Sequence, residues 1–205
     1  MKHQLIMSVD VESVGLHGEG FAAGWAIYNT AAPERGVSLH CISAPMPVCK
    51  DKETATWLAE HLPLDRYGRI VALPHLHSYQ QVKHPQEVRQ FFWSAWLAIR
   101  HEGAGRTDID ARMLSDCGWP VEANFLSACV SDAPAGRSWQ GPYPLLDLGS
   151  IIVAKGGDPL EVFARTDSEL PEHHPTADAL QSLRIYCEAM GYPVPRVQTD
   201  APIVG

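Results

Sequence analysis

The sequence has no apolar run long enough to cross a membrane. A transmembrane helix needs about 18 or more consecutive apolar residues, and no stretch of the 205 residues reaches that length. The apolar run at residues 5–9 (LIMSV) is short and is followed at once by Asp10, which is not the pattern of a signal peptide. The sequence therefore predicts no membrane partner and a cytoplasmic protein.

Cysteine patterns that would indicate disulfides or structural zinc are also missing. The chain has five cysteines, an odd number, and no two of them form a Cys-x-x-Cys pair. Neither His75 and His77 nor His40 and Cys41 have the spacing of a structural zinc site. We therefore expect reduced thiols and no disulfide framework.

Positive charge is scarce. The chain has 16 lysines and arginines against 24 aspartates and glutamates, a formal net charge of −8. Proteins that hold nucleic acid in long electrostatic grooves are usually basic, so this balance argues against such a groove. An enzyme whose positive charge arrives as bound metal is compatible with it.

Short apolar strands and amphipathic helices alternate along the chain. Glycine and proline turns separate the first three strands, which predicts a three-strand meander. Proline at the start and glycine after the end mark the longer helices. The expected strands are 5–9, 21–29, 37–43 and 111–115, the expected helices are 53–61, 85–102, 121–130 and 175–190, and residues 145–155 are a strand turning into a helix or a capped helix.

This order predicts an α/β fold, with a mixed sheet made of the meander plus parallel strands and with helices packed on it. The length suits a single domain. We expect that domain to cover residues 1–192 and residues 193–205 to form an irregular, proline-rich tail.

The first candidate site is the sequence Asp-Val-Glu at residues 10–12. Residues i and i+2 of a strand point to the same face, so Asp10 and Glu12 would share one side of the sheet. Paired carboxylates at a strand end offer the hard oxygen ligands that Mg²⁺ and Mn²⁺ prefer. The alternative is two ordinary surface acids at a solvated strand end.

The second candidate lies at the start of the last helix. His173 precedes Pro175, which opens the helix, and Asp178 follows about one turn inside it. A carboxylate there can point back toward the histidine. The alternative is a polar loop before a helix whose first turn favours an acid because of the helix dipole.

Taken together, the two motifs resemble the DnaQ-like, or DEDDh, family of 3′–5′ exonucleases. That family opens with D-x-E on its first strand and closes with H-x-x-x-x-D at its last helix. This sequence has D-V-E at 10–12 and H-H-P-T-A-D-A-L at 173–180, and the resemblance extends over about residues 5–190.

The resemblance implies a ribonuclease H-like fold and hydrolysis of terminal phosphodiesters at the 3′ end of single-stranded RNA or DNA, releasing nucleoside monophosphates. It implies two Mg²⁺ or Mn²⁺ ions held by Asp10, Glu12, Asp178 and one middle acid, with His173 as general base. It is compatible with a homodimer, and it favours RNA over DNA because small stand-alone members often process RNA.

The middle acid departs from the family pattern. Aligning the family's middle helix with residues 123–126 (ANFL) puts Glu122 at the acid position, whereas Asp116 ends the preceding strand. We expect Glu122 to be the ligand, with Asp116 as the alternative. Without a metal role, Glu122 would complement a helix dipole and Asp116 would be a turn residue. We expect Asp147 to cap a helix.

Because of this departure, a second function stays open. The chain could be a non-catalytic ribonuclease H-like module that binds nucleic acid or a protein. The spacing between His173 and Asp178 and the Asp-Val-Glu motif argue against it, because a binding module has no need of a general base. A polymerase proofreading subunit is disfavoured because no long extra segment is present to dock a polymerase.

Overall fold

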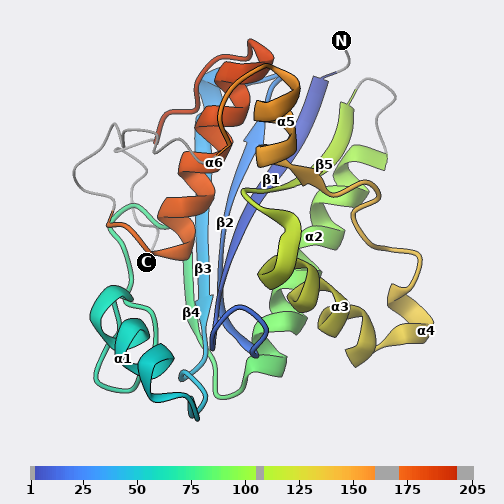
Figure 1. Cartoon of the computed structure of the whole chain (residues 1–205). Helices are drawn as coiled ribbons and strands as arrows, with labels where there is room; N and C mark the ends of the chain where they lie inside the picture. Colours follow the sequence, from blue (N-terminus) through green and yellow to red (C-terminus); the bar gives the residue numbers. More distant parts are fainter. Residues whose placement is uncertain (1–2, 105–108, 160–170, 198–205) are drawn as a thin grey trace.

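A single mixed sheet forms the centre of the molecule (Figure 1). The computed structural model describes residues 3–104, 109–159 and 171–197. The strand order in the sheet is β4-β3-β2-β1-β5-β6. The strands are β1 (His3–Ser13), β2 (Gly20–Asn29), β3 (Val37–Ser43), β4 (Ser78–Gln81), β5 (Ile109–Ser115) and β6 (Leu146–Asp147).

The expected meander is confirmed. β1 pairs antiparallel with β2, and β2 pairs antiparallel with β3. The other three strands are added in parallel: β5 beside β1, β6 beside β5 and β4 beside β3. The α/β class is therefore confirmed, and the mixed sheet with helices packed on it is consistent with a ribonuclease H-like fold.

Helices cover both faces of the sheet. Figure 1 shows α2 on one face and α5 and α6 on the other. The helices are α1 (Lys52–His61), α2 (Pro85–Ala104), α3 (Ala123–Asp132), α4 (Pro134–Arg137), α5 (Leu148–Ala154) and α6 (Pro175–Met190), with a 3₁₀ turn η1 (Pro33–Arg35) and a π turn η2 (Gly118–Glu122). Within the described part of the chain, no helix has the length and apolar character needed to cross a bilayer.

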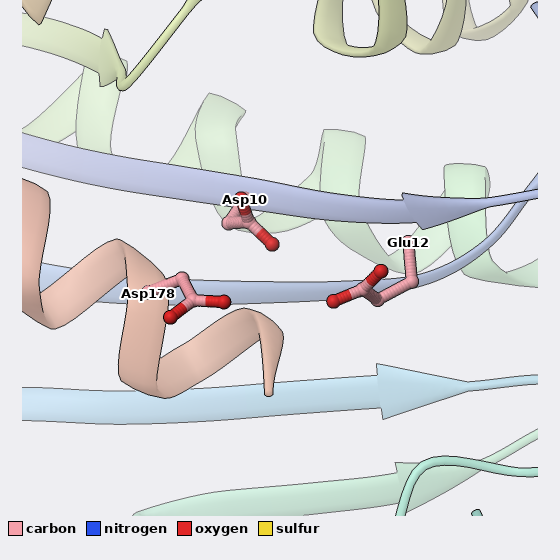
Figure 2. Close-up of side chains that lie close together, drawn as sticks. All are labelled: Asp10, Glu12 and Asp178. Carbon is pink, nitrogen blue, oxygen red and sulfur yellow. The ribbon is translucent and has the colours of Figure 1, made fainter. Parts of the chain in front are cut away.

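The two faces of β1 have different partners because side chains alternate along a strand. Leu5, Met7 and Val9 are buried in the cluster that includes α2 and α3. Ile6 is buried in the cluster that includes α5 and α6. Asp10 has the same parity as Ile6, so its carboxylate is on the α6 face of the sheet (Figure 2).

The tryptophans of the long helix α2 are core residues, as their helical spacing with Phe92 predicts. Trp93 is 2% exposed and Trp96 is 3% exposed. Trp25 of β2 is buried against Phe92, with ring centroids 5.8 Å apart. These aromatic rings therefore stabilise the packing of α2 on the sheet and are not free to stack on nucleobases.

Some boundaries differ from the prediction. The short edge strand β4 has no predicted counterpart, because its sequence, SYQQ, lacks apolar alternation. Residues 133–144, for which the sequence predicts neither a strand nor a helix, contain the single turn of α4. The start of the expected tail is held against the sheet: Val37 donates a backbone hydrogen bond to Arg196, and the Tyr28 hydroxyl donates one to Pro193. Residues 198–205 lie outside the described residues.

Candidate metal centre and general base

Strand β1 carries the first two acids just beyond the end of its parallel neighbour. The β1–β5 ladder ends at the pair Val9–Ser115. On the other side, Asp10 pairs with Gly24 of β2, so the backbone is still anchored there. Asp10 and Glu12 thus lie where β5 no longer covers the strand, at the carboxyl end where α/β sheets commonly bind ligands.

Helix α6 carries the third acid. It begins at Pro175, a residue suited to the first helical position because its backbone has no N–H to satisfy. Asp178 lies in the first turn, and its amide donates to the carbonyl of His174 at 3.0 Å. Gly191, in the left-handed conformation with φ 73°, ends the helix.

A glycine allows this helix to approach the sheet. A Cβ atom at Gly24 would lie 2.1 Å from the backbone nitrogen of Thr176 and 2.3 Å from the carbonyl carbon of Pro175. The Thr176 hydroxyl fixes the contact by donating to the carbonyl of His40 at 2.8 Å. Since Gly24 is the pairing partner of Asp10, the same contact brings the start of α6 next to the first acid.

The three acids meet. One carboxylate oxygen from each of Asp10, Glu12 and Asp178 lies within 4.8 Å of the other two. Figure 2 shows the three side chains directed into a common space between β1 and the first turn of α6. Residues near the two ends of the chain therefore form one compact oxygen-rich group.

The electrostatics of this group are unfavourable without a cation. Burial, followed by the charges of Glu12 and Asp178, raises the pKa of Asp10 well above its ordinary value. Burial and the charges of Asp178 and Glu122 raise the pKa of Glu12 to about 8. The charged neighbours with the largest effects on both groups are all carboxylates, so a bound cation would supply the missing positive charge.

The two candidates for the middle acid differ in burial. Glu122 is 8% exposed, and burial raises its pKa to about 7. Hydrogen bonds from the backbone amides of Glu122 and Val11 lower that pKa, but by less than burial raises it. Asp116 is exposed. Glu122 affects the pKa of both Asp10 and Glu12, whereas Asp116 affects that of Asp10 less strongly.

Among the described residues, neither Glu122 nor Asp116 belongs to a group of three or more side chains whose ligand atoms all lie within 4.8 Å of one another. Glu122 lies close enough to influence the cluster and its side chain is directed into the protein, so it stays the predicted fourth ligand. Asp116 stays the alternative.

Asp147 caps a helix, as expected. Its carboxylate accepts hydrogen bonds from the amide of Ser150, in the first turn of α5, and from the amide of Gly118, both at 2.7 Å. These two hydrogen bonds occupy both oxygens of the carboxylate. Asp147 therefore fixes η2 and α5 to each other beside the candidate site.

The expected general base lies against α1. His173 has a left-handed backbone conformation (φ 57°), which is uncommon for a residue with a side chain. Its ring makes edge contacts with Trp57 and His61 of α1, at centroid distances of 5.3 and 5.8 Å. Trp57 and His61 are themselves stacked, 4.5 Å apart. His173 is partly exposed and therefore open to solvent and to a substrate.

His174 has a structural role instead. It is fully buried, and its Nδ1 accepts the amide of Thr176 while its Nε2 donates to the carbonyl of Val71 at 3.0 Å. These two bonds require the neutral ring, and burial lowers its pKa to about 4. With both nitrogens occupied, His174 is not available to accept a proton from a substrate, which supports the assignment of the base to His173.

The composition of the cluster fits a hard divalent cation. All its ligand atoms are carboxylate oxygens, which Mg²⁺ and Mn²⁺ prefer over nitrogen or sulfur. The five cysteines are free thiols, and none belongs to this group. The chain matches no protein-family model and no curated protein.

Two contributions to the site were not expected from the sequence. Gly24 in the interior of a strand is a signal for close backbone approach, and that signal was available in the run AAGWA. The contact of His173 with Trp57 and His61 has no such signal, because it joins segments far apart in the chain.

Proposed function

We propose that this protein is a metal-dependent 3′–5′ exonuclease that hydrolyses terminal phosphodiesters of single-stranded nucleic acid, with RNA preferred over DNA. The observation that carries the proposal is the meeting of Asp10, Glu12 and Asp178 within 4.8 Å, with His173 just before the helix that carries Asp178. The sequence resemblance supplies the reaction and its polarity.

Asp10, Glu12 and Asp178 would hold the metal, and Glu122 would complete the ligand set. When bound, two Mg²⁺ or Mn²⁺ ions would stabilise the attacking and leaving oxygens of an in-line displacement at phosphorus. The carboxylates bind the ions and fix their positions. Because the empty cluster is destabilised by mutual repulsion, these side chains favour cation uptake.

His173 would take the proton from the attacking water. Histidine is the side chain that most often serves as a general base in enzymes. Edge contacts with Trp57 and His61 support the His173 ring. The five free cysteines support a reducing compartment, and we place the protein in the cytoplasm as part of the proposal.

Purified protein incubated with single-stranded RNA and DNA, labelled at the 5′ or the 3′ end, tests this function. Mg²⁺ or Mn²⁺ is expected to support stepwise loss of nucleotides from the 3′ end, with nucleoside monophosphates as products, and EDTA is expected to stop it. Asp10→Asn is the matched inactive variant.

Cleavage that continues in EDTA, or removal of nucleotides from the 5′ end, would contradict the proposal. Binding of the oligonucleotide without hydrolysis under any metal would favour the non-catalytic module instead.

A further inference from the structure

We infer that the turn formed by residues 65–69, which follows α1, is a binding surface for single-stranded nucleic acid outside the metal cluster. The inference rests on the proposed function, because it places the part of the strand upstream of the terminal nucleotide. It depends on three exposed or half-buried side chains: Arg66, Tyr67 and Arg69.

Both arginines lie over one exposed aromatic ring. Tyr67 is 56% exposed, and the guanidinium carbons of Arg66 and Arg69 lie over its ring, 4.7 and 5.5 Å from the ring centroid. An accessible ring beside cationic groups is the usual means by which proteins hold single strands without sequence preference. The ring stacks on a base, and guanidinium groups bind phosphates or stack on bases themselves.

The charge of these arginines is not neutralised locally. Within the described residues neither forms an ion pair, and the Nε atom of Arg69 is buried with no hydrogen-bond partner. The Arg69 Nη1 atom donates only a long bond of 3.4 Å to the neutral amide of Gln81. By contrast, Arg89 on α2 is paired with both Asp132 and Glu19.

The acid within the turn, Asp65, is occupied by the backbone. The carboxylate of Asp65 accepts the amides of Tyr67 and Arg69 at 2.7 and 3.0 Å. Gly68, with φ +72°, closes the turn by donating to the carbonyl of Asp65. Asp65 therefore shapes the turn, so that the arginines over the ring keep donors for a phosphate.

The base of the turn is attached to the candidate site. Val71 donates its amide to Pro63 and accepts a hydrogen bond from the ring of His174, which caps α6. His173, the expected general base, directly precedes His174 in the chain, and α6 carries Asp178. Residues 63–71 thus connect the surface formed by Arg66, Tyr67 and Arg69 to the start of α6 through the hydrogen bond between the His174 ring and the Val71 carbonyl.

The charge of the segment that contains the turn also favours binding of nucleic acid. Residues 50–83 contain five of the 16 lysines and arginines of the chain and four of its 24 acids, so this segment has a formal charge of +1. In a protein with a net charge of −8, such a segment repels a polyanion less than the chain as a whole does. A strand whose 3′ end is at the metal cluster would leave the site over this surface.

The test compares substrates of two lengths. Hydrolysis of a dinucleotide and of a decauridylate or decathymidylate is measured with Mn²⁺ for wild type, Tyr67→Ala, Tyr67→Phe and Arg66→Gln/Arg69→Gln. The ratio of kcat/KM for the decamer to that for the dinucleotide is expected to fall about tenfold in Tyr67→Ala and in the arginine variant, and to be retained in Tyr67→Phe, because one stacked base contributes about that factor.

A second measurement separates this surface from catalysis. Fluorescence anisotropy of a labelled decamer, with the inactive Asp10→Asn protein as background, gives the dependence of the logarithm of affinity on the logarithm of salt concentration. Loss of two phosphate contacts is expected to reduce the slope by about 1.4. Arg35→Gln/Lys155→Gln is the matched control, since both side chains are exposed and lie outside residues 50–83.

If wild type hydrolyses both substrates but the length ratio and the salt slope are unchanged in the variants, the inference is wrong and the proposed function stands. If wild type hydrolyses neither, the proposed function fails. In that case a tenfold loss of decamer affinity in Tyr67→Ala, absent from the control, would still support the binding surface.

Discussion

The metal-free protein is expected to lose stability as the pH rises from 6.5 to 8. Glu12 and Glu122 have pKa values raised from 4.5 to about 8 and about 7. In the unfolded chain both groups are already ionised above pH 6.5, whereas in the folded chain each keeps its proton until its own higher pKa is reached. The free energy of unfolding therefore falls as the pH rises toward those values and levels off above them.

The size of the effect follows from the pKa values. Each group lowers the free energy of unfolding by about 1.4 kcal/mol per pH unit while it is protonated only in the folded state. Over this window Glu12 contributes for most of the range and Glu122 for its first half-unit, which gives about 2–3 kcal/mol from these two groups. In a domain of this size that corresponds to a fall in Tm of roughly 5–10 °C. Asp10, whose pKa is also raised, acts in the same direction.

Two other sets of groups have smaller effects in this window. The buried rings of His40 and His174 have pKa values lowered to about 4, whereas an unfolded imidazole is still about half protonated at pH 6.5. As the unfolded chain loses these protons, the two rings raise the free energy of unfolding by about 0.8 kcal/mol between pH 6.5 and 8, which offsets part of the fall. The buried thiols of Cys41, Cys129 and Cys187 have pKa values raised to about 12, and they lower stability only above the window, where unfolded thiols ionise.

Thermal unfolding in EDTA at pH 6.5, 7.2 and 8.0 measures the effect. The double variant Asp10→Asn/Glu12→Gln is expected to lose most of the pH dependence. Glu60→Gln/Glu188→Gln, which removes two exposed acids elsewhere, is expected to keep it. Mg²⁺ is expected to raise the Tm of wild type more at pH 8.0 than at pH 6.5, since binding releases protons, and to leave the double variant unchanged.

A wild-type Tm that is flat across the window in EDTA would refute this reasoning. So would an equal fall in the Asp10→Asn/Glu12→Gln variant, because the destabilising charge would then lie outside the cluster.

The strands and longer helices could be predicted because each depends on local periodicity. The strand β1 is a short apolar run that is buried on both faces, and its two acids share one face at the strand end because side chains alternate with a period of two. The limits of α6 follow from Pro175 and Gly191, and the cap at Asp147 follows from its place before an apolar helix. These features need only neighbouring residues, which the sequence supplies directly.

The parts that could not be predicted depend on contacts between distant segments. The pairing of β5 with β1, the edge strand β4 and the contact of His173 with α1 are set by tertiary packing. The sequence places Glu122 at the family's acid position, yet it does not show that its carboxylate would lie against the amide of Val11, outside the closest group of acids. That detail depends on the π turn η2, which local patterns do not predict.

Three further predictions separate the roles assigned at the site. His173→Ala is expected to lower kcat by about 10²–10⁴-fold while Mg²⁺-induced stabilisation persists. His174→Ala is expected to lower the Tm, because loss of the helix cap lowers the free energy of unfolding by about 1 kcal/mol or more. If His174→Ala lost activity and His173→Ala lost only stability, the general base would be His174. Glu122→Gln is expected to remove metal-dependent hydrolysis, and Asp116→Asn is expected to leave most of it. If instead Asp116→Asn were inactive and Glu122→Gln active, Asp116 would be the metal ligand. Gly24→Ala tests how the site is assembled. Its new Cβ would lie 2.1 Å from a backbone nitrogen in the first turn of α6, so either the helix or the strand must shift. Overpacking of this kind costs about 1–3 kcal/mol, and the shift would separate the acid on α6 from the two on β1. We therefore expect a lower Tm together with weaker metal-induced stabilisation at matched metal concentration. An unchanged response to metal in a protein with lowered Tm would show that close contact between α6 and β2 is needed for folding alone.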